Sequence, residues 1–237
     1  MKIRVGVNNM RAILLAAGMG TRLRPLTLDT PKSLIEINNK PLLERQIEFL
    51  KEKGIGEIII VTGYLQEKFE YLKEKYGVKL IHNDKYDIYN NIYTMYLVRE
   101  YLEDAYVIDA DIYIVKNFIL ESSEVSLYFS AYKKGFKDEW KLYFNKDLKV
   151  ENIKVESGEG YILSGVSYWS KKDTSLIIKA LEYMVEKEEF NNLYWDDIVK
   201  NNISKLDVYI KKVDSDSIFE IDNLDELEYV KSKVELK

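Results

Sequence analysis

Short runs of consecutive apolar residues alternate, along the first half of the chain, with segments whose apolar residues recur every three or four positions. A short run rich in Val, Ile and Leu predicts a buried strand, and the three-to-four spacing predicts a helix that packs by one face. The predicted strands are residues 12–17, 33–37, 57–62, 78–82 and 105–109. The predicted helices are residues 41–54, 63–76 and 93–102. Strands that alternate with helices in this way form a parallel sheet.

The alternation weakens after residue 110, where short apolar segments follow one another without long helices between them. These further strands are residues 126–132, 141–144, 152–156 and 161–169. The last part of the chain predicts helices at residues 173–188, 193–200 and 224–234, with a strand at residues 207–213. We therefore expect an α/β fold with a mixed, mostly parallel central sheet and a small antiparallel excursion.

The length of 237 residues fits one substantial domain, and no segment has the composition of a flexible linker. We expect that domain to span residues 10–237. Residues 1–9 precede the first predicted strand and are either a leader or an extra edge strand.

Composition narrows the class of function. The 35 basic and 40 acidic residues give a formal net charge of −5, which argues against a nucleic-acid-binding protein with an overall basic face. Cysteine is absent, which excludes disulfides and thiolate metal sites and suits a reducing cytoplasm. No apolar run reaches the length of a membrane span. We expect a cytoplasmic protein that is not inserted in a membrane and acts on small molecules.

The apolar run at residues 12–17 ends in a stretch suited to phosphate. Gly18 and Gly20 have no side chains, so backbone amides there can approach an anion closely. Arg22, Arg24 and Lys32 follow; Arg presents a planar fork to phosphate oxygens and Lys a point charge. On these residues alone, an ordinary strand, turn and basic loop is the simpler interpretation.

The longer string resembles the nucleotidyltransferase signature Gly-x-Gly-Thr-Arg-Leu-x-Pro followed by Pro-Lys-x-Leu, typical of sugar-nucleotide-type pyrophosphorylases. The matching positions are Gly18, Gly20, Thr21, Arg22, Leu23, Pro25, Pro31, Lys32 and Leu34. This resemblance implies a three-layer Rossmann-like nucleotidyltransferase fold with a nucleoside triphosphate held over the loop. The residues expected to bind the nucleotide here are Ala16, Ala17, Gly18, Gly20, Thr21, Arg22 and Lys32. Arg22 and Lys32 are also expected to be catalytic.

Two acidic positions are candidates for a metal site. Asp111 follows the predicted strand at residues 105–109, and Glu220 and Asp222 are two residues apart, so in an extended segment they point to one face. On sequence position alone, a local structural role fits each residue about as well as metal binding: Asp111 can start a turn, and Asp222 can cap the last helix. The resemblance implies a Mg²⁺ ion held by Asp111, Glu220 and Asp222, with Asp111 also catalytic. Asp109 is the weaker alternative for this metal site, and we expect it to be structural.

Over nearly the whole chain the resemblance is closer to the CTP:phosphocholine cytidylyltransferases, bacterial enzymes that make CDP-choline. The matching stretches are residues 63–65, 83–86, 90–91, 96–97, 107–111, 163–167, 194–196 and 220–222. The choline-site residues of that family correspond to Trp140, Tyr194 and Asp196. A quaternary ammonium donates no hydrogen bond and is best held by aromatic faces near a carboxylate, so these residue types fit. Trp195 could join them, or it could pack the helix that it begins, as Tyr194 also could.

The remaining contacts are less defined. For the cytosine base we expect backbone groups near residues 16–18 with the side chain of Asn83 or Asn91, which can donate and accept at a base edge. Many sugar pyrophosphorylases carry a Glu-Lys-Pro segment whose lysine contacts the acceptor phosphate, and this chain has none. The possible substitutes are Lys133, Lys141 and Lys154. His82, the one histidine, is expected to be structural.

The expected function is a Mg²⁺-dependent cytidylyltransferase that joins CTP and phosphocholine. One alternative is the same enzyme chemistry with another acceptor, such as a sugar 1-phosphate or an aminoalkyl phosphate or phosphonate. The other is a non-catalytic nucleotide sensor on the same fold.

Overall fold

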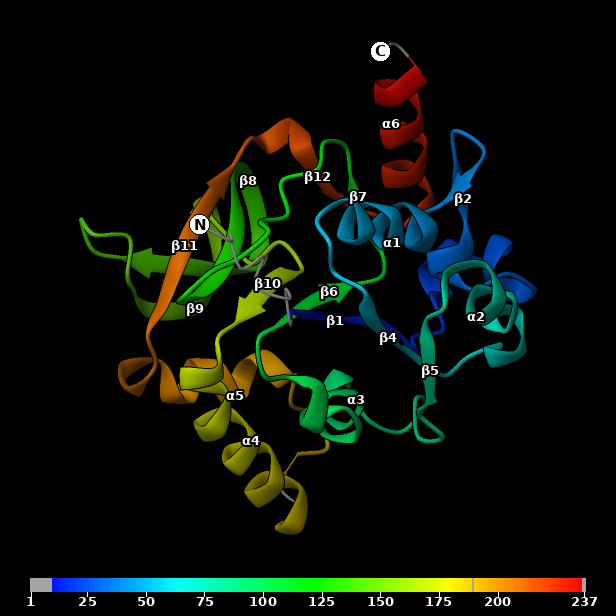
Figure 1. The fold of residues 1–237 in the computed structure, drawn as a ribbon. Coiled ribbons are helices and arrows are strands. Elements are labelled where there is room, and N and C mark those ends of the chain that lie inside the picture. Colours follow the sequence, from blue (N-terminus) through cyan, green and yellow to red (C-terminus); the bar gives the residue numbers. More distant parts are fainter. Residues whose placement is uncertain (1–9, 189, 236–237) are drawn as a thin grey trace, which may run out of the picture.

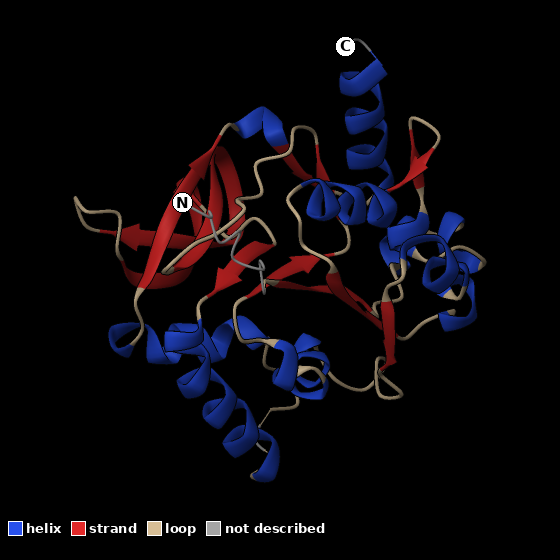
Figure 2. Cartoon of the chain, viewed as in Figure 1, coloured by secondary structure: helices blue, strands red, loops and turns tan. Residues whose placement is uncertain are grey.

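The computed structural model describes residues 10–188 and 190–235, and it shows a central sheet with helices on both sides (Figures 1 and 2). The stretch at residues 1–9, predicted as a leader or edge strand, lies outside the described residues. The strands follow the order β11-β8-β10-β6-β1-β4-β5, and β9 pairs with β8. Their bounds are β1 (Arg11–Ala16), β4 (Glu57–Thr62), β5 (Lys79–His82), β6 (Ala105–Asp109), β8 (Ser126–Phe144), β9 (Val150–Tyr161), β10 (Val166–Trp169) and β11 (Val208–Val213).

Strand β1 lies at the centre of the sheet, parallel to β4 on one side and to β6 on the other. β5 extends the parallel part beyond β4. β10 then runs antiparallel to both β6 and β8, and β11 is parallel to β8. The predicted α/β fold with a mixed, mostly parallel sheet and an antiparallel excursion is therefore confirmed.

Both faces of the sheet are apolar, so the chain covers both with helices. Along β1, Leu14 faces a core shared with α1 and α2, and Ile13 faces a core shared with α3, α4 and α5. The bounds are α1 (Leu42–Glu52), α2 (Tyr71–Tyr76), α3 (Asn91–Leu97), α4 (Lys171–Glu186), α5 (Trp195–Asn202) and α6 (Leu224–Glu235). In Figure 1 α1 and α6 lie above the sheet and α3, α4 and α5 below it. Among the described residues, no helix combines the length and apolar character needed to span a membrane.

Two predicted helices are shorter than their apolar spacing indicated. Residues 63–76 form a 3-10 helix at Gln66–Phe69 and only then α2. Leu65 takes a left-handed conformation with φ of 50°, which a helix cannot continue through. Residues 93–102 are divided between α3 and a 3-10 helix at Arg99–Tyr101. Both segments are helical as predicted, but in each the α-helical hydrogen bonding is interrupted and replaced in part by a 3-10 helix.

The strands predicted at residues 126–132 and 141–144 are the two ends of one long strand, β8. The charged segment between them has no apolar alternation, yet its backbone pairs with β9 through several bulges. The strand predicted at residues 161–169 is instead interrupted before β10. Gly165 lies at the interruption with φ of 68°, and a β-carbon there would lie 2.7 Å from Cγ1 of Ile112, so both conformation and space require glycine.

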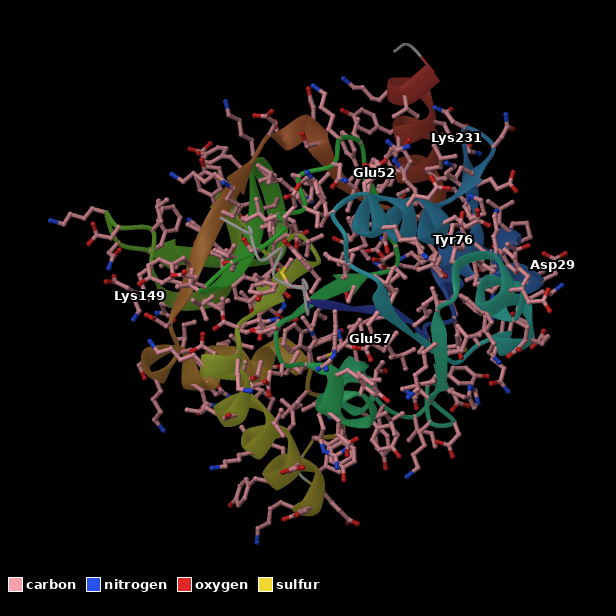
Figure 3. All side chains as sticks on the ribbon, in the orientation of Figure 1. Asp29, Glu52, Glu57, Tyr76, Lys149 and Lys231 are labelled. Atoms are coloured by element: carbon pink, nitrogen blue, oxygen red, sulfur yellow. The ribbon has the colours of Figure 1, made fainter. Side chains whose placement is uncertain are left out.

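Three short strands, β3 (Lys40–Pro41), β7 (Ile112–Ile114) and β12 (Ile218–Glu220), were not predicted. β7 and β12 form a separate antiparallel pair. Another short pair is β2 (Glu36–Ile37) with β3. Side chains with nitrogen or oxygen at their tips line the outline of the molecule in the view of Figure 3.

The central position of β1 predicts the cost of truncating it. Leu14 is fully buried, so Leu14→Ala should lower the free energy of unfolding by about 3 kcal/mol, through lost burial and the cavity left behind. Leu28→Ala makes the same chemical change at a side chain that is 58% exposed and should change it by less than about 0.5 kcal/mol. Urea unfolding of both variants measures the difference. Equal midpoints would contradict this placement of β1.

Candidate active site

The loop that follows β1 folds back on itself. Gly20 has φ of 59°, and a β-carbon there would lie 2.8 Å from Cβ of Lys32. The hydroxyl of Thr27 donates to the carbonyl oxygen of Gly20 at 2.8 Å and closes the loop. The strand predicted at residues 33–37 begins instead as a 3-10 helix, Lys32–Leu34, before the short β2. Glycine at position 20 thus lets Lys32 pack over the start of the loop.

Three carboxylates gather beside this loop. Asp111 follows β6, and the pairing of β7 with β12 sets Glu220 opposite Ile112. The backbone N–H of Ile221 also donates to the carbonyl oxygen of Asp111 at 3.2 Å. One oxygen from each of Asp111, Glu220 and Asp222 lies within 4.8 Å of the others. The unpredicted pair of short strands is therefore what joins two acidic positions more than a hundred residues apart.

Basic side chains of the loop reach this acidic cluster. Nζ of Lys32 donates to Oδ2 of Asp111 and to Oδ1 of Asp222, each at 2.7 Å. Nη2 of Arg22 lies 2.8 Å from the same oxygen of Asp222. Burial opposes the charged form of Lys32, but the charges and hydrogen bonds of the two aspartates outweigh it and raise the pKa of Lys32. Lys32 is therefore a fixed cation that links the loop to both ends of the cluster.

Carboxylates this close together oppose one another's ionisation. Burial, and then the charges of Asp111 and Asp222, raise the pKa of Glu220 to about 8. Burial and the surrounding carboxylates also hold the pKa of Asp109 well above its usual range. Oδ1 of Asp111 is buried and has no hydrogen-bond partner within the described residues. An unpartnered oxygen within a set of carboxylates fits a hard divalent cation such as Mg²⁺, which prefers oxygen ligands.

A cavity of about 280 Å³ opens between the loop and α3. Its lining includes Ala16, Ala17, Gly18, Lys32 and Asp111 on the loop side, and Tyr86, Tyr89, Asn90, Asn91 and Thr94 on the other side. Gly20, Thr21 and Arg22 lie on the loop but outside this lining. Tyr86 and Tyr89 were not predicted as site residues. Tyr86 lies in the matching stretch 83–86, whereas nothing in the pattern separates Tyr89 from the other tyrosines. The cavity is large enough to receive part of a nucleotide and is the expected nucleotide site.

The two asparagines predicted for the base lie differently. Asn91 lines the cavity. Asn83 is fully buried and lies outside it, because its Nδ2 donates to Thr94 at 3.0 Å and its Oδ1 accepts from the backbone N–H of Lys85 at 2.9 Å. Asn83 can reach the cavity through Thr94 and not directly.

The predicted acceptor residues come from β8 and α5. The rings of Trp140 and Tyr194 meet edge-to-face with centroids 6.3 Å apart, and Tyr194 is 48% exposed. Trp195 is buried and packs edge-on against Trp169, at 5.3 Å between centroids. Of the two roles considered for Trp195, the structure supports packing. The rings of Trp140 and Tyr194 remain for a cation, and Nζ of Lys200 already lies over the Trp140 ring, 5.1 Å from its centroid.

Asp196 lies in the first turn of α5. Its Oδ1 accepts a hydrogen bond from the hydroxyl of Tyr128 at 3.0 Å. Burial raises the pKa of Asp196 to about 7, and the hydrogen bond from Tyr128 opposes that rise. A smaller cavity of about 30 Å³ is lined by Asp196, Tyr128 and Asp109, and Asp109 lines the larger cavity too. Asp109 thus borders both the cavity beside Asp196 and the cavity beside Asp111 of the acidic cluster.

Comparison with known proteins places this chain in a family. Residues 11–128 match the family described as nucleotidyl transferase. The choline-phosphate cytidylyltransferase of Streptococcus pneumoniae is 53% identical over 91% of this chain and 94% of its own length. The enzyme of that name from Haemophilus influenzae is 41% identical over 95% of this chain and 97% of its own.

A solved structure agrees. The CTP:phosphocholine cytidylyltransferase from Streptococcus pneumoniae superposes with a TM-score of 0.93 at 51% identity, covering 95% of this chain and 99% of that one. With its fold, its site and its relatives in accord, the chain belongs to the choline-phosphate cytidylyltransferase family of nucleotidyltransferases.

Proposed function

We propose that the chain joins CTP and phosphocholine to give CDP-choline and pyrophosphate. The observation that carries this proposal is the meeting of Lys32 and Arg22 with the carboxylates of Asp111 and Asp222. Cations suited to phosphate oxygens and acids suited to a metal lie in direct contact, beside a cavity that can hold a nucleotide. Family membership supports the choice of CTP and phosphocholine.

The nucleotide is held by the chain's own cations. The triphosphate lies over the loop from Gly18 to Arg22, where backbone amides and the Lys32 ammonium meet its oxygens. Lys32 and Arg22 exchange their aspartate partners for phosphate oxygens as the nucleotide enters. Arg22 is 69% exposed along its side chain, so it can turn toward the leaving pyrophosphate at little cost.

Asp111, Glu220 and Asp222 would hold the Mg²⁺ ion. Bound there, the ion supplies charge neutralisation for the phosphate oxygens of the nucleotide. The exchange of partners by Lys32 and Arg22 makes the carboxylate oxygens available to it.

The reaction needs no general base from the chain. A phosphate monoester is already anionic, so an oxygen of phosphocholine forms the new bond to the α-phosphorus while the bond to the bridging oxygen of pyrophosphate breaks. Pyrophosphate leaves with that electron pair. The residues of this chain contribute by holding the two substrates in line and by neutralising charge.

The ammonium end of phosphocholine binds beside Trp140, Tyr194 and Asp196 through aromatic rings and one carboxylate. Among the candidate lysines for its phosphate, Lys141 is paired with Glu156 at 2.9 Å, and Lys154 lies over the ring of Tyr143. Lys133 and Glu220 line the same cavity of about 520 Å³, and the charge of Lys133 opposes the rise in the pKa of Glu220. We assign the acceptor phosphate to Lys133.

A panel of acceptors tests the proposal directly. Pyrophosphate release with CTP should be fastest with phosphocholine, and phosphoethanolamine should be about tenfold less efficient in kcat/KM because it lacks the methyl groups that face the rings. Glucose 1-phosphate, 2-aminoethylphosphonate and UTP in place of CTP complete the panel. A preference for glucose 1-phosphate would overturn the acceptor, and binding of CTP without pyrophosphate release would support a sensor instead.

Acceptor binding should depend on pH through Asp196. The groups facing Asp196 are Tyr128 from β8, Asp109 from β6 and Asp197 of its own helix. Because its pKa is about 7 and the cation needs the ionised form, kcat/KM for phosphocholine should fall about tenfold per pH unit below pH 7. Tyr128→Phe removes a hydrogen bond to the ionised form and should move the midpoint upward.

The control is Asp196→Asn, which cannot titrate. Phosphocholine's own phosphate titrates equally with both enzymes, so the ratio of wild-type to Asp196→Asn kcat/KM isolates the carboxylate. A ratio that does not change between about pH 5.5 and about pH 8, on either side of the expected midpoint, would contradict the role of Asp196.

A further inference from the structure

One side chain, Asn91, connects the nucleotide cavity to the acceptor residues. Its Oδ1 accepts a hydrogen bond from the backbone N–H of Trp195 at 3.0 Å, across 104 residues of sequence. We propose that Asn91 is a positioning residue for the acceptor, which holds the first turn of α5 and thereby places Tyr194 and Asp196. The inference rests on the proposed function and adds a residue to its acceptor side.

The first turn of α5 depends on contacts from outside the helix. α5 has eight residues, and the first N–H groups of any helix have no partner within it. The backbone N–H of Tyr194 donates to Oδ2 of Asp197, and the backbone N–H of Asp197 donates to the carbonyl oxygen of Tyr194, each at 3.0 Å. These two hydrogen bonds close the turn on itself. Tyr128 holds the carboxylate of Asp196. Asn91 is the partner that holds the backbone of this turn to another element.

The position of Tyr194 is the most sensitive to this bond. The ring of Trp195 is fixed in the core by its contact with Trp169. The hydrogen bond from the N–H of Trp195 to Oδ1 of Asn91 then fixes the orientation of the backbone at Trp195, and with it the direction of the chain on either side. Tyr194 is about half exposed and its ring contacts that of Trp140 at one edge. Because the Tyr194 ring has few contacts of its own, the backbone at Tyr194 determines where the ring lies.

The other end of the Asn91 amide faces a different substrate. Asn91 is the first residue of α3 and lines the nucleotide cavity. Its Nδ2 makes no hydrogen bond with any residue that the structure describes, so it can donate to the nucleotide. The oxygen therefore serves the acceptor helix and the nitrogen is open to CTP. The two roles can be separated by substitution.

The test compares Asn91→Ala with Asn91→Asp by measuring kcat and KM for both substrates. Asn91→Ala removes both ends and should raise KM for phosphocholine by about three- to tenfold, the worth of one such hydrogen bond. Asn91→Asp keeps an oxygen for the N–H of Trp195 at the start of a helix, where a carboxylate is favoured. It should return KM for phosphocholine to within about twofold of wild type while KM for CTP stays raised.

Asn202→Ala is the matched control. Nδ2 of Asn202 donates to the carbonyl oxygen of Ile198 at 2.9 Å, so this variant also loses one amide bond on α5, at its far end. It should leave KM for both substrates within about twofold of wild type. If Asn91→Ala does not fold, Asn91→Leu keeps the volume, removes both polar ends and takes its place.

The outcomes separate the inference from the function it rests on. A wild-type enzyme that uses phosphocholine, with an unchanged phosphocholine KM in Asn91→Ala, overturns the inference alone. So does a phosphocholine KM raised as much in Asn91→Asp as in Asn91→Ala, or raised as much in Asn202→Ala. A wild-type enzyme that does not use phosphocholine overturns the proposed function, and this inference with it.

Discussion

The contact of Lys32 with both Asp111 and Asp222 is the interaction on which the rest of the site depends. These three residues come from the loop after β1, the end of β6 and the segment after β12. Each carboxylate raises the cost of ionising the others, and one buried ammonium between them makes the arrangement stable. The parallel order of β6, β1 and β4 brings the loop and Asp111 to one edge of the sheet, where open α/β sheets bind their ligands.

The two substrates are served by neighbouring parts of one framework. Asp109 lines both the nucleotide cavity and the smaller cavity beside Asp196, and Gly165 closes against Ile112 just beneath them. β10 lies between β8 and β6 and pairs antiparallel with both. The ring of Trp195, in α5, packs against that of Trp169, in β10. Acceptor residues from the last third of the chain can therefore face a nucleotide held by its first residues.

The features that depend on residues close together in the sequence could be predicted from the sequence. The loop from Gly18 to Lys32, the strands around it and the acidic residues at 111, 220 and 222 were all identified from spacing and resemblance. Contacts between segments far apart in the sequence could not be identified in this way. They are the β7–β12 pair, the hydrogen bond of Tyr128 to Asp196, and the hydrogen bond between Asn91 and Trp195. Trp195 shows the limit most clearly, since an aromatic residue beside a binding residue has one pattern whether it packs the core or faces a ligand.

Mn²⁺ binding measured by titration calorimetry tests the central claim, that Asp111, Glu220 and Asp222 share one divalent ion beside the loop. With CTP present and no acceptor, wild type should bind Mn²⁺, and Asp111→Asn and Asp222→Asn should each weaken that binding at least about tenfold. Asp147→Asn, an exposed carboxylate in the turn between β8 and β9, should match wild type. Wild-type Mn²⁺ affinity in both cluster variants would contradict the account.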